Sequence, residues 1–102
     1  MIHVIAIITA KPNQRATILD HYRNNVAAVR AEQGCIEYGA VVDADNALPF
    51  QTEWGQDTFV VVEKWESMDA LKAHAAAPHM AEYGKKTKDL IASRVIHIMQ
   101  PV

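Results

Sequence analysis

Two strand-forming segments of this chain carry apolar side chains on both faces, and this feature limits the possible folds more than any other. The segments are residues 2–10 and 58–66, where β-branched and aromatic residues dominate. A strand that faces water on one side normally alternates apolar and polar residues. We therefore expect both segments to lie inside a sheet that is covered on both of its faces.

Helix-forming and strand-forming segments follow one another in a definite order. The order is strand, helix, strand, strand, interrupted helix and strand, over residues 2–10, 14–32, 35–43, 58–66, 68–76 with 79–92, and 94–99. Gly34 is the expected C-terminal cap of the first helix, and Ser67 is the expected N-terminal cap of the second. Pro78 interrupts the second helix because proline removes a helix hydrogen bond and clashes with the preceding turn.

The β-α-β-β-α-β order predicts an α+β, ferredoxin-like fold, with a four-stranded antiparallel sheet and both helices on one face. The 102 residues are enough for a single domain over residues 1–102. The helices leave the second face of the sheet uncovered, although that face is apolar. We expect a second copy of the chain to cover it, which gives a two-fold homodimer with room for an interior pocket between the two sheets.

Residues 44–57 form a loop that is longer than a usual hairpin connection. Pro49 and Gly55 favour turns in this loop, which also contains the apolar residues Leu48, Phe50 and Trp54. The loop is either a flap over a binding pocket or a contact made by an edge strand or by a dimer. Both interpretations fit the sequence.

The charge pattern and the apolar segments exclude several classes of partner. The formal net charge is −2, whereas a nucleic-acid interface normally shows a basic stripe. Lys85, Lys86 and Lys88 lie close together, but acidic residues flank them, as on a solvated helix face. The apolar start of the chain is shorter than the ~20 residues that span a bilayer, so we expect no membrane partner.

Cys35 is the only cysteine, which suits a reducing compartment and predicts a cytoplasmic protein.

One carboxylate, one indole and two imidazoles gather around the junction between residues 58–66 and the helix that follows. Glu63 shares a strand face with Trp65 and with apolar neighbours. A carboxylate on an apolar face is costly unless it is paired. Burial would raise the pKa of Glu63, which suits acid–base chemistry. The alternative is a structural hydrogen bond to a backbone amide or to a histidine.

His74 borders the apolar stripe of the second helix, where its ring can reach the rim of a pocket. Because histidine changes its protonation near neutral pH, His74 is the best candidate for a general base. A partly buried structural histidine is the alternative. His79 follows Pro78 and either caps the next helical piece or faces the same cavity. Trp65 is either a core anchor or a residue that stacks on a substrate.

Several stretches resemble the antibiotic-biosynthesis-monooxygenase-like family, whose members are small dimeric α/β-barrel proteins. They are RAEQGCIEY at residues 30–38, EKWES at 63–67, ALKAH at 70–74 and PHM at 78–80. The resemblance covers nearly the whole chain and implies a dimeric α/β barrel with a pocket for a small-molecule substrate. It also implies that Tyr38, Met80 and Tyr83 line this pocket, and Phe50 joins them if the loop closes over it.

No motif in the chain indicates a bound metal or another cofactor. His74 and His79 are five residues apart with Pro78 between them, and neither HExxH nor CxxC occurs. The haem-degrading branch of the family uses an asparagine on the first strand, a tryptophan on the second helix and a downstream histidine. Here the first strand has no asparagine. By the same resemblance, His74 stands where those proteins have the tryptophan, and the position of their histidine ligand falls near Gly84.

The resemblance therefore implies a quinol-monooxygenase-like enzyme that needs no cofactor and acts on a small aromatic compound. His74, supported by Glu63, would remove a proton from a substrate hydroxyl, and the resulting anion would react directly with dioxygen. Two alternatives remain open: an isomerase of a small hydroxy-ketone that uses the same base, and a dimeric ligand-binding protein without catalysis.

Overall fold

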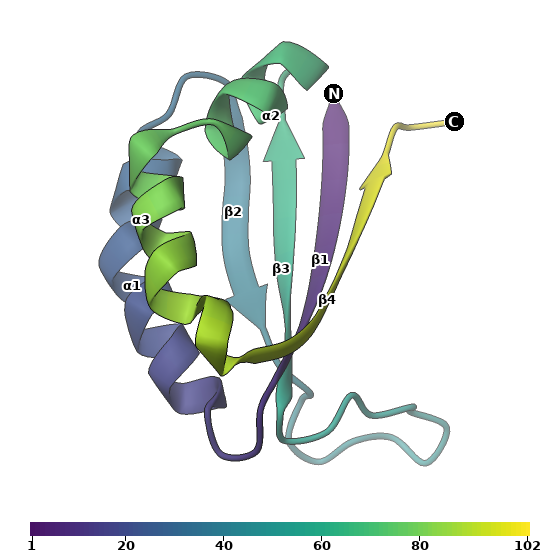
Figure 1. Cartoon of the computed structure of the whole chain (residues 1–102). Helices are drawn as coiled ribbons and strands as arrows, with labels where there is room; N and C mark the ends of the chain where they lie inside the picture. The colour runs from purple at the N-terminus through teal and green to yellow at the C-terminus, as the bar shows by residue number, and fades with distance from the viewer.

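The computed structural model describes residues 1–102 and shows a four-stranded antiparallel sheet with helices on one side (Figure 1). The strands are β1 (Ile2–Ala10), β2 (Cys35–Val41), β3 (Thr58–Trp65) and β4 (Ile91–Met99), in the order β2-β3-β1-β4. The helices are α1 (Arg15–Arg30), α2 (Met68–Ala75) and α3 (Pro78–Thr87), and the 3-10 helix η1 (Lys88–Leu90) follows α3. The expected α+β, ferredoxin-like fold is confirmed.

The hydrophobic core lies between the helices and one face of the sheet. Alternate residues of β1 and β3 meet the inner face of α1 there, and the buried set includes Val4, Ala6, Ile8, Ile18, Val29, Phe59 and Val61. The β1–β3 register places Val4 opposite Glu63 and Ala6 opposite Val61. Because side chains alternate along a strand, Glu63 must point to the same side as this core.

Capping chemistry sets the break between α2 and α3 as the sequence predicts. The hydroxyl of Ser67 accepts a hydrogen bond from the backbone N–H of Ala70 at 3.1 Å and so begins α2. Pro78 occupies the first turn of α3, where its missing N–H costs no helix hydrogen bond. The second helix is therefore two separate helices that approach the sheet at different places (Figure 1).

The structure corrects several expectations about where elements begin and end. α1 ends at Arg30 rather than at residue 32, and Gly34 lies in the following turn with a φ of 84° instead of capping the helix. β2 ends at Val41 rather than at residue 43. Its continuation leaves the sheet because the carboxylate of Asp43 accepts hydrogen bonds from two backbone N–H groups of the loop before β3.

The last strand is also longer than the expected range 94–99. α3 stops at Thr87, the turn of η1 follows, and β4 begins at Ile91. The hydroxyl of Thr87 donates a hydrogen bond to the carbonyl oxygen of Tyr83 at 2.9 Å, within the last turn of α3. Hydroxyl side chains compete in this way with backbone pairing and favour helix ends.

Two apolar surfaces remain uncovered in one copy of the chain. The helices do not extend over β4, so Ile96 and Ile98 are 44% and 52% exposed on the helix side. The opposite face of the sheet has no helix over it (Figure 1). Strand register places Ile5, Ile7, Val60, Val62, Val95 and Met99 on that face, where Val60 is nevertheless only 6% exposed. No helix in the structure has the length and apolar character needed to cross a membrane.

Candidate active site

A cavity of about 320 Å³ opens between the helices and the sheet, beside the uncovered strand β4. Its wall is mainly hydrophobic and has three charged or titratable members besides Tyr38: Glu63 on β3, His74 on α2 and Arg94 on β4. The expectation from sequence was an interior pocket between the sheets of two copies. The structure places Glu63 and His74 instead in a cavity within one chain, on the helix side of the sheet.

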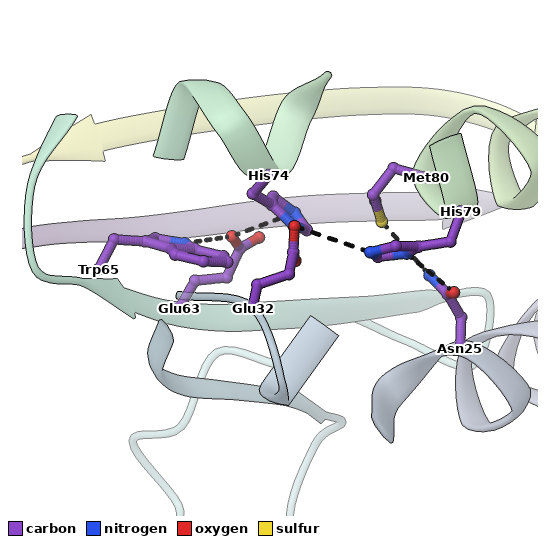
Figure 2. Close-up of polar contacts among 7 residues, drawn as sticks. All are labelled: Asn25, Glu32, Glu63, Trp65, His74, His79 and Met80. Carbon is purple, nitrogen blue, oxygen red and sulfur yellow. Dashed lines mark hydrogen bonds and ion pairs between the residues drawn. The ribbon is translucent and has the colours of Figure 1, made fainter. Parts of the chain in front are cut away.

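His74 is buried, and a carboxylate approaches each of its two ring nitrogens (Figure 2). Nδ1 lies 2.7 Å from Oε2 of Glu32, and Nε2 lies 3.9 Å from Oε1 of Glu63. Because a carboxylate only accepts hydrogen bonds, the ring carries its hydrogen on Nδ1 and donates it to Glu32. In the neutral ring, Nε2 then keeps a free lone pair, which is the arrangement of a base held by an orienting carboxylate.

Trp65 contacts both Glu63 and His74 and supports their positions. Its ring is fully buried, its centroid lies 4.6 Å from that of His74, and the two ring planes are tilted by 32°. Its Nε1–H donates a hydrogen bond to Oε1 of Glu63 at 2.9 Å. Trp65 does not line the cavity, so the structure places it as a support for both Glu63 and His74.

The carboxyl group of Glu63 is buried in the same place, and its environment changes its acidity. Burial raises the pKa of Glu63, and the hydrogen bond from Trp65 and the nearby His74 oppose this effect only in part. The predicted structural hydrogen bond exists, but its donor is the indole of Trp65 and not a backbone amide or a histidine, and the acid–base role of Glu63 stays a prediction. The residue makes a fixed hydrogen bond, and it also places a titratable group next to Nε2 of His74.

Glu32 is the main site residue that the sequence reasoning missed. The predicted helix over residues 14–32 places Glu32 in its last turn. Because α1 ends at Arg30, the chain turns earlier and brings Glu32 under α2, where its side chain is only 17% exposed. A signal was present, since Glu32 lies in the stretch AEQGC, but spacing along the chain gives no sign that it meets His74 across 42 positions.

His79 lies beside Glu32 and is not part of the cavity wall (Figure 2). Its Nε2 is 3.7 Å from Oε1 of Glu32, and its Nδ1 is 3.1 Å from Oδ1 of Asn25 on α1. The amide nitrogen of Asn25 in turn donates to the sulfur of Met80 at 3.3 Å. Asn25 was not singled out from the sequence, because a lone asparagine on a helix carries no motif.

Tyr38 and Met80 line the cavity, as the family resemblance implies. The ring of Tyr38 meets the ring of His74 edge-on at 5.7 Å and stacks on Tyr22 at 5.8 Å. Burial raises the pKa of Tyr38 far above its ordinary value, so its hydroxyl stays protonated. Tyr38 is therefore placed as a neutral group beside the candidate base.

Two other expected pocket residues lie elsewhere. Tyr83 faces a smaller polar hollow between α1 and α3, together with His79, and burial raises its pKa to about 12. Phe50 is 84% exposed on the loop before β3, and no residue of that loop lines the cavity of its own chain. Arg15 holds the end of this loop, because its guanidinium donates to the carbonyl oxygens of Gly55 and Thr58.

Arg94 is a second residue that sequence reasoning placed only as the start of a strand. It lies on β4 with its side chain at the cavity wall and makes no ion pair within the chain. An unpaired guanidinium beside an apolar cavity attracts negative charge. The signal in the sequence was a single cation in the apolar strand RVIHIM. No three His, Cys, Asp or Glu side chains are arranged to hold a metal ion.

Comparison with known proteins identifies the class to which this fold and site belong. The family model "Antibiotic biosynthesis monooxygenase" matches residues 1–86, so the chain belongs to that family. It is 37% identical to "Probable quinol monooxygenase YgiN" of Escherichia coli (strain K12), over 99% of this chain and 98% of that protein.

Solved structures of related proteins share the fold. PA3566 from Pseudomonas aeruginosa has a TM-score of 0.81 and 25% sequence identity, over 99% of this chain and 93% of that one. Rv0793 from Mycobacterium tuberculosis has a TM-score of 0.81 and 24% identity, over 99% and 94% of the two chains. These comparisons confirm both the family resemblance and the ferredoxin-like fold.

Proposed function

We propose that this protein is a monooxygenase that needs no cofactor and acts on a small quinol-type aromatic compound. The observation that carries the proposal is the hydrogen bonding of the two ring nitrogens of His74. Its Nδ1 is bound to Glu32, while its Nε2 has no hydrogen-bond partner within the chain and lies at the wall of an apolar cavity. The name of the YgiN relative supports a quinol as the substrate class.

Proton removal is the first step of the proposed reaction. Nε2 of His74 takes the proton of a quinol hydroxyl, and the electron pair of the O–H bond stays on the substrate oxygen. Glu32 stabilises the imidazolium through the 2.7 Å hydrogen bond, as an orienting carboxylate does in other histidine bases. Glu63 approaches the newly protonated Nε2 from 3.9 Å and adds to this stabilisation when it is ionised.

The quinolate anion is rich in electrons and reduces dioxygen itself. One electron passes to dioxygen, and the two radicals combine to form a bond between a ring carbon and one oxygen atom. The imidazolium of His74 returns its proton to the peroxide. Loss of the ring hydrogen and cleavage of the O–O bond then give a carbonyl group and water. The balance is quinol plus dioxygen to hydroxyquinone plus water.

The walls of the cavity support these steps. Its apolar lining excludes water from the reactive anion, and electrostatic interactions are stronger where water is absent. Arg94 adds a permanent positive charge at the wall, which favours the anionic form of the substrate. Tyr38 remains a neutral hydroxyl beside His74 and offers a hydrogen-bond donor to a substrate oxygen.

Isotopically labelled dioxygen tests the identity of the reaction. The metal-stripped protein is given a panel of small quinols, and the products are analysed by mass spectrometry and by a peroxide assay. We expect one labelled oxygen atom in a hydroxyquinone, the other in water, and no hydrogen peroxide. Labelled peroxide with an unlabelled quinone would indicate an oxidase instead. Conversion of hydroxy-ketones without oxygen would favour an isomerase, and binding without turnover would favour a carrier.

We also propose that the protein acts as a homodimer in a reducing cytoplasm. The uncovered sheet face carries apolar side chains on β1, β3 and β4, together with His3, Lys64 and His97, and packing against the same face of a second copy removes the apolar ones from water. Cys35, the only cysteine, is a free thiol, which supports a reducing compartment.

A further inference from the structure

The Nε2 atom of His79 is a buried polar atom without a hydrogen-bond partner. Buried polar atoms in folded proteins are nearly always paired, so such an atom calls for a physical reason. The nearest charged group is the carboxylate of Glu32, whose Oε1 lies 3.7 Å away. The same carboxylate orients His74 through its other oxygen.

The surrounding hydrogen bonds determine which nitrogen of His79 carries a hydrogen. The sulfur of Met80 can only accept, so the Asn25 amide must point its NH₂ group at that sulfur, as it does at 3.3 Å. Oδ1 of Asn25 therefore faces His79, and Nδ1 of His79 must donate to it over 3.1 Å. In a neutral ring, Nε2 would then present a lone pair to a carboxylate oxygen, and two acceptors would face each other.

A hydrogen on Nε2 of His79 removes this conflict. The ring then donates on both sides, to Asn25 and toward Glu32, and its positive charge faces the negative charge of the carboxylate. We propose that His79 is a positioning residue of the site: protonated on Nε2, it holds the Glu32 carboxylate in the position that orients His74. The inference rests on the proposed role of His74 as the base.

This arrangement also gives His74 and His79 separate roles on the two sides of Glu32. His74 lines the apolar cavity, whereas His79 lines the polar hollow of about 150 Å³ between α1 and α3 and is 28% exposed in its side chain. Glu32 lies between them and lines neither. The positive charge that holds the Glu32 carboxylate therefore comes from His79, which lies on the side of Glu32 that faces the solvent-accessible hollow. The other titratable or charged groups around His79 are His21, Glu82, Tyr83 and Lys86.

Kinetics of two His79 variants test the proposal. His79→Leu removes the donor, so we expect kcat to fall about tenfold with KM unchanged, a part of what a general base contributes. His79→Gln keeps an N–H that can face Glu32 at every pH. We expect it to retain most of kcat, because its amide N–H replaces the donor that faces Glu32. His21→Gln, in the same hollow but without contact to Glu32, is the matched control and should behave as wild type.

Nitrogen-15 NMR of the histidine rings tests the same inference without any substrate. In the folded protein we expect hydrogens on both nitrogens of His79 and on Nδ1 of His74. A neutral His79 with hydrogen on Nδ1 alone would overturn the proposal, as would a folded His79→Leu variant with the wild-type kcat. If wild type converts no quinol, the proposed function fails, and the NMR result alone decides the role of His79.

Discussion

At the scale of single residues, the buried carboxyl group of Glu63 links the stability of the protein to pH. Because burial raises its pKa above the ordinary value of about 4.5, the folded chain binds this proton more tightly than the unfolded chain. The free energy of unfolding therefore falls as pH rises from about 4.5 through the raised pKa, and it stays lower above it.

Glu63→Gln isolates this effect, because the amide oxygen can still accept the hydrogen bond from Trp65. We expect the variant to match wild type near pH 4 and to be more stable than wild type at pH 7 to 8, where the buried carboxyl group of wild type is ionised. Urea denaturation across this pH range measures the difference. A variant that loses stability relative to wild type as pH rises would contradict the direction of the pKa shift.

The residue scale is also where sequence reasoning reached its limit. Glu63 and His74 could be singled out because each breaks a local pattern, a charge on an apolar strand and an imidazole beside a helix stripe. Glu32 breaks no such pattern, and Arg94, a single cation at the start of an apolar strand, gives no sign that a cavity lies beside it. They join the site because a helix ends two residues early and because the helices stop short of β4, and both facts depend on tertiary packing.

At the scale of secondary-structure elements, the turn after α1 is the part on which the site depends most. Gly34 has a φ of 84°, and a Cβ atom added there would lie 2.6 Å from the Cβ of Ala70 on α2. A residue with a side chain would be strained in this conformation and would push α2 away from the turn that carries Glu32.

Gly34→Ala should therefore lower the free energy of unfolding by about 2 kcal/mol, from the left-handed backbone and the contact together. Gly84→Ala is the matched control. A Cβ at Gly84 meets nothing within 4 Å, and alanine favours the helical interior of α3, so this change should stabilise the protein by about 1 kcal/mol. Chemical denaturation of both variants checks the prediction, and equal effects of the two changes would contradict it.

Most elements could be predicted from the sequence because local chemistry determines them. The β-branched run gives β1 with its observed bounds, Ser67 caps α2, and Pro78 separates α2 from α3. The boundaries that differ are those where contacts distant in sequence decide. Gly34 packs against α2, and Asp43 leaves the sheet to bind the backbone of Gly55 and its neighbour.

At the scale of the whole molecule, the apolar face of the sheet that no helix covers predicts association of two copies. Val62 lies on this face, paired with Ile5 of β1. Val62→Lys places a charge in the proposed interface but leaves the helix-side core untouched. We expect light scattering to show a dimer for wild type and a monomer for Val62→Lys. Ala73→Lys, on the exposed side of α2, is the control and should remain dimeric.

A monomeric wild-type chain at micromolar concentration would contradict this prediction. A Val62→Lys protein that remains dimeric would place the interface elsewhere, for example on the loop that carries the exposed residues Phe50 and Trp54.

The central claim is that His74 removes a proton from the substrate, and the pH dependence of oxygen uptake tests it most directly. The rate is measured for wild type and His74→Gln on one quinol substrate, from about pH 6 to about pH 10. We expect kcat/KM of His74→Gln to be about a hundredfold lower near pH 7. The deficit should shrink toward pH 10, where phenolic hydroxyls ionise without help. A variant with the wild-type rate near pH 7, or a deficit that stays constant at every pH, would contradict the account.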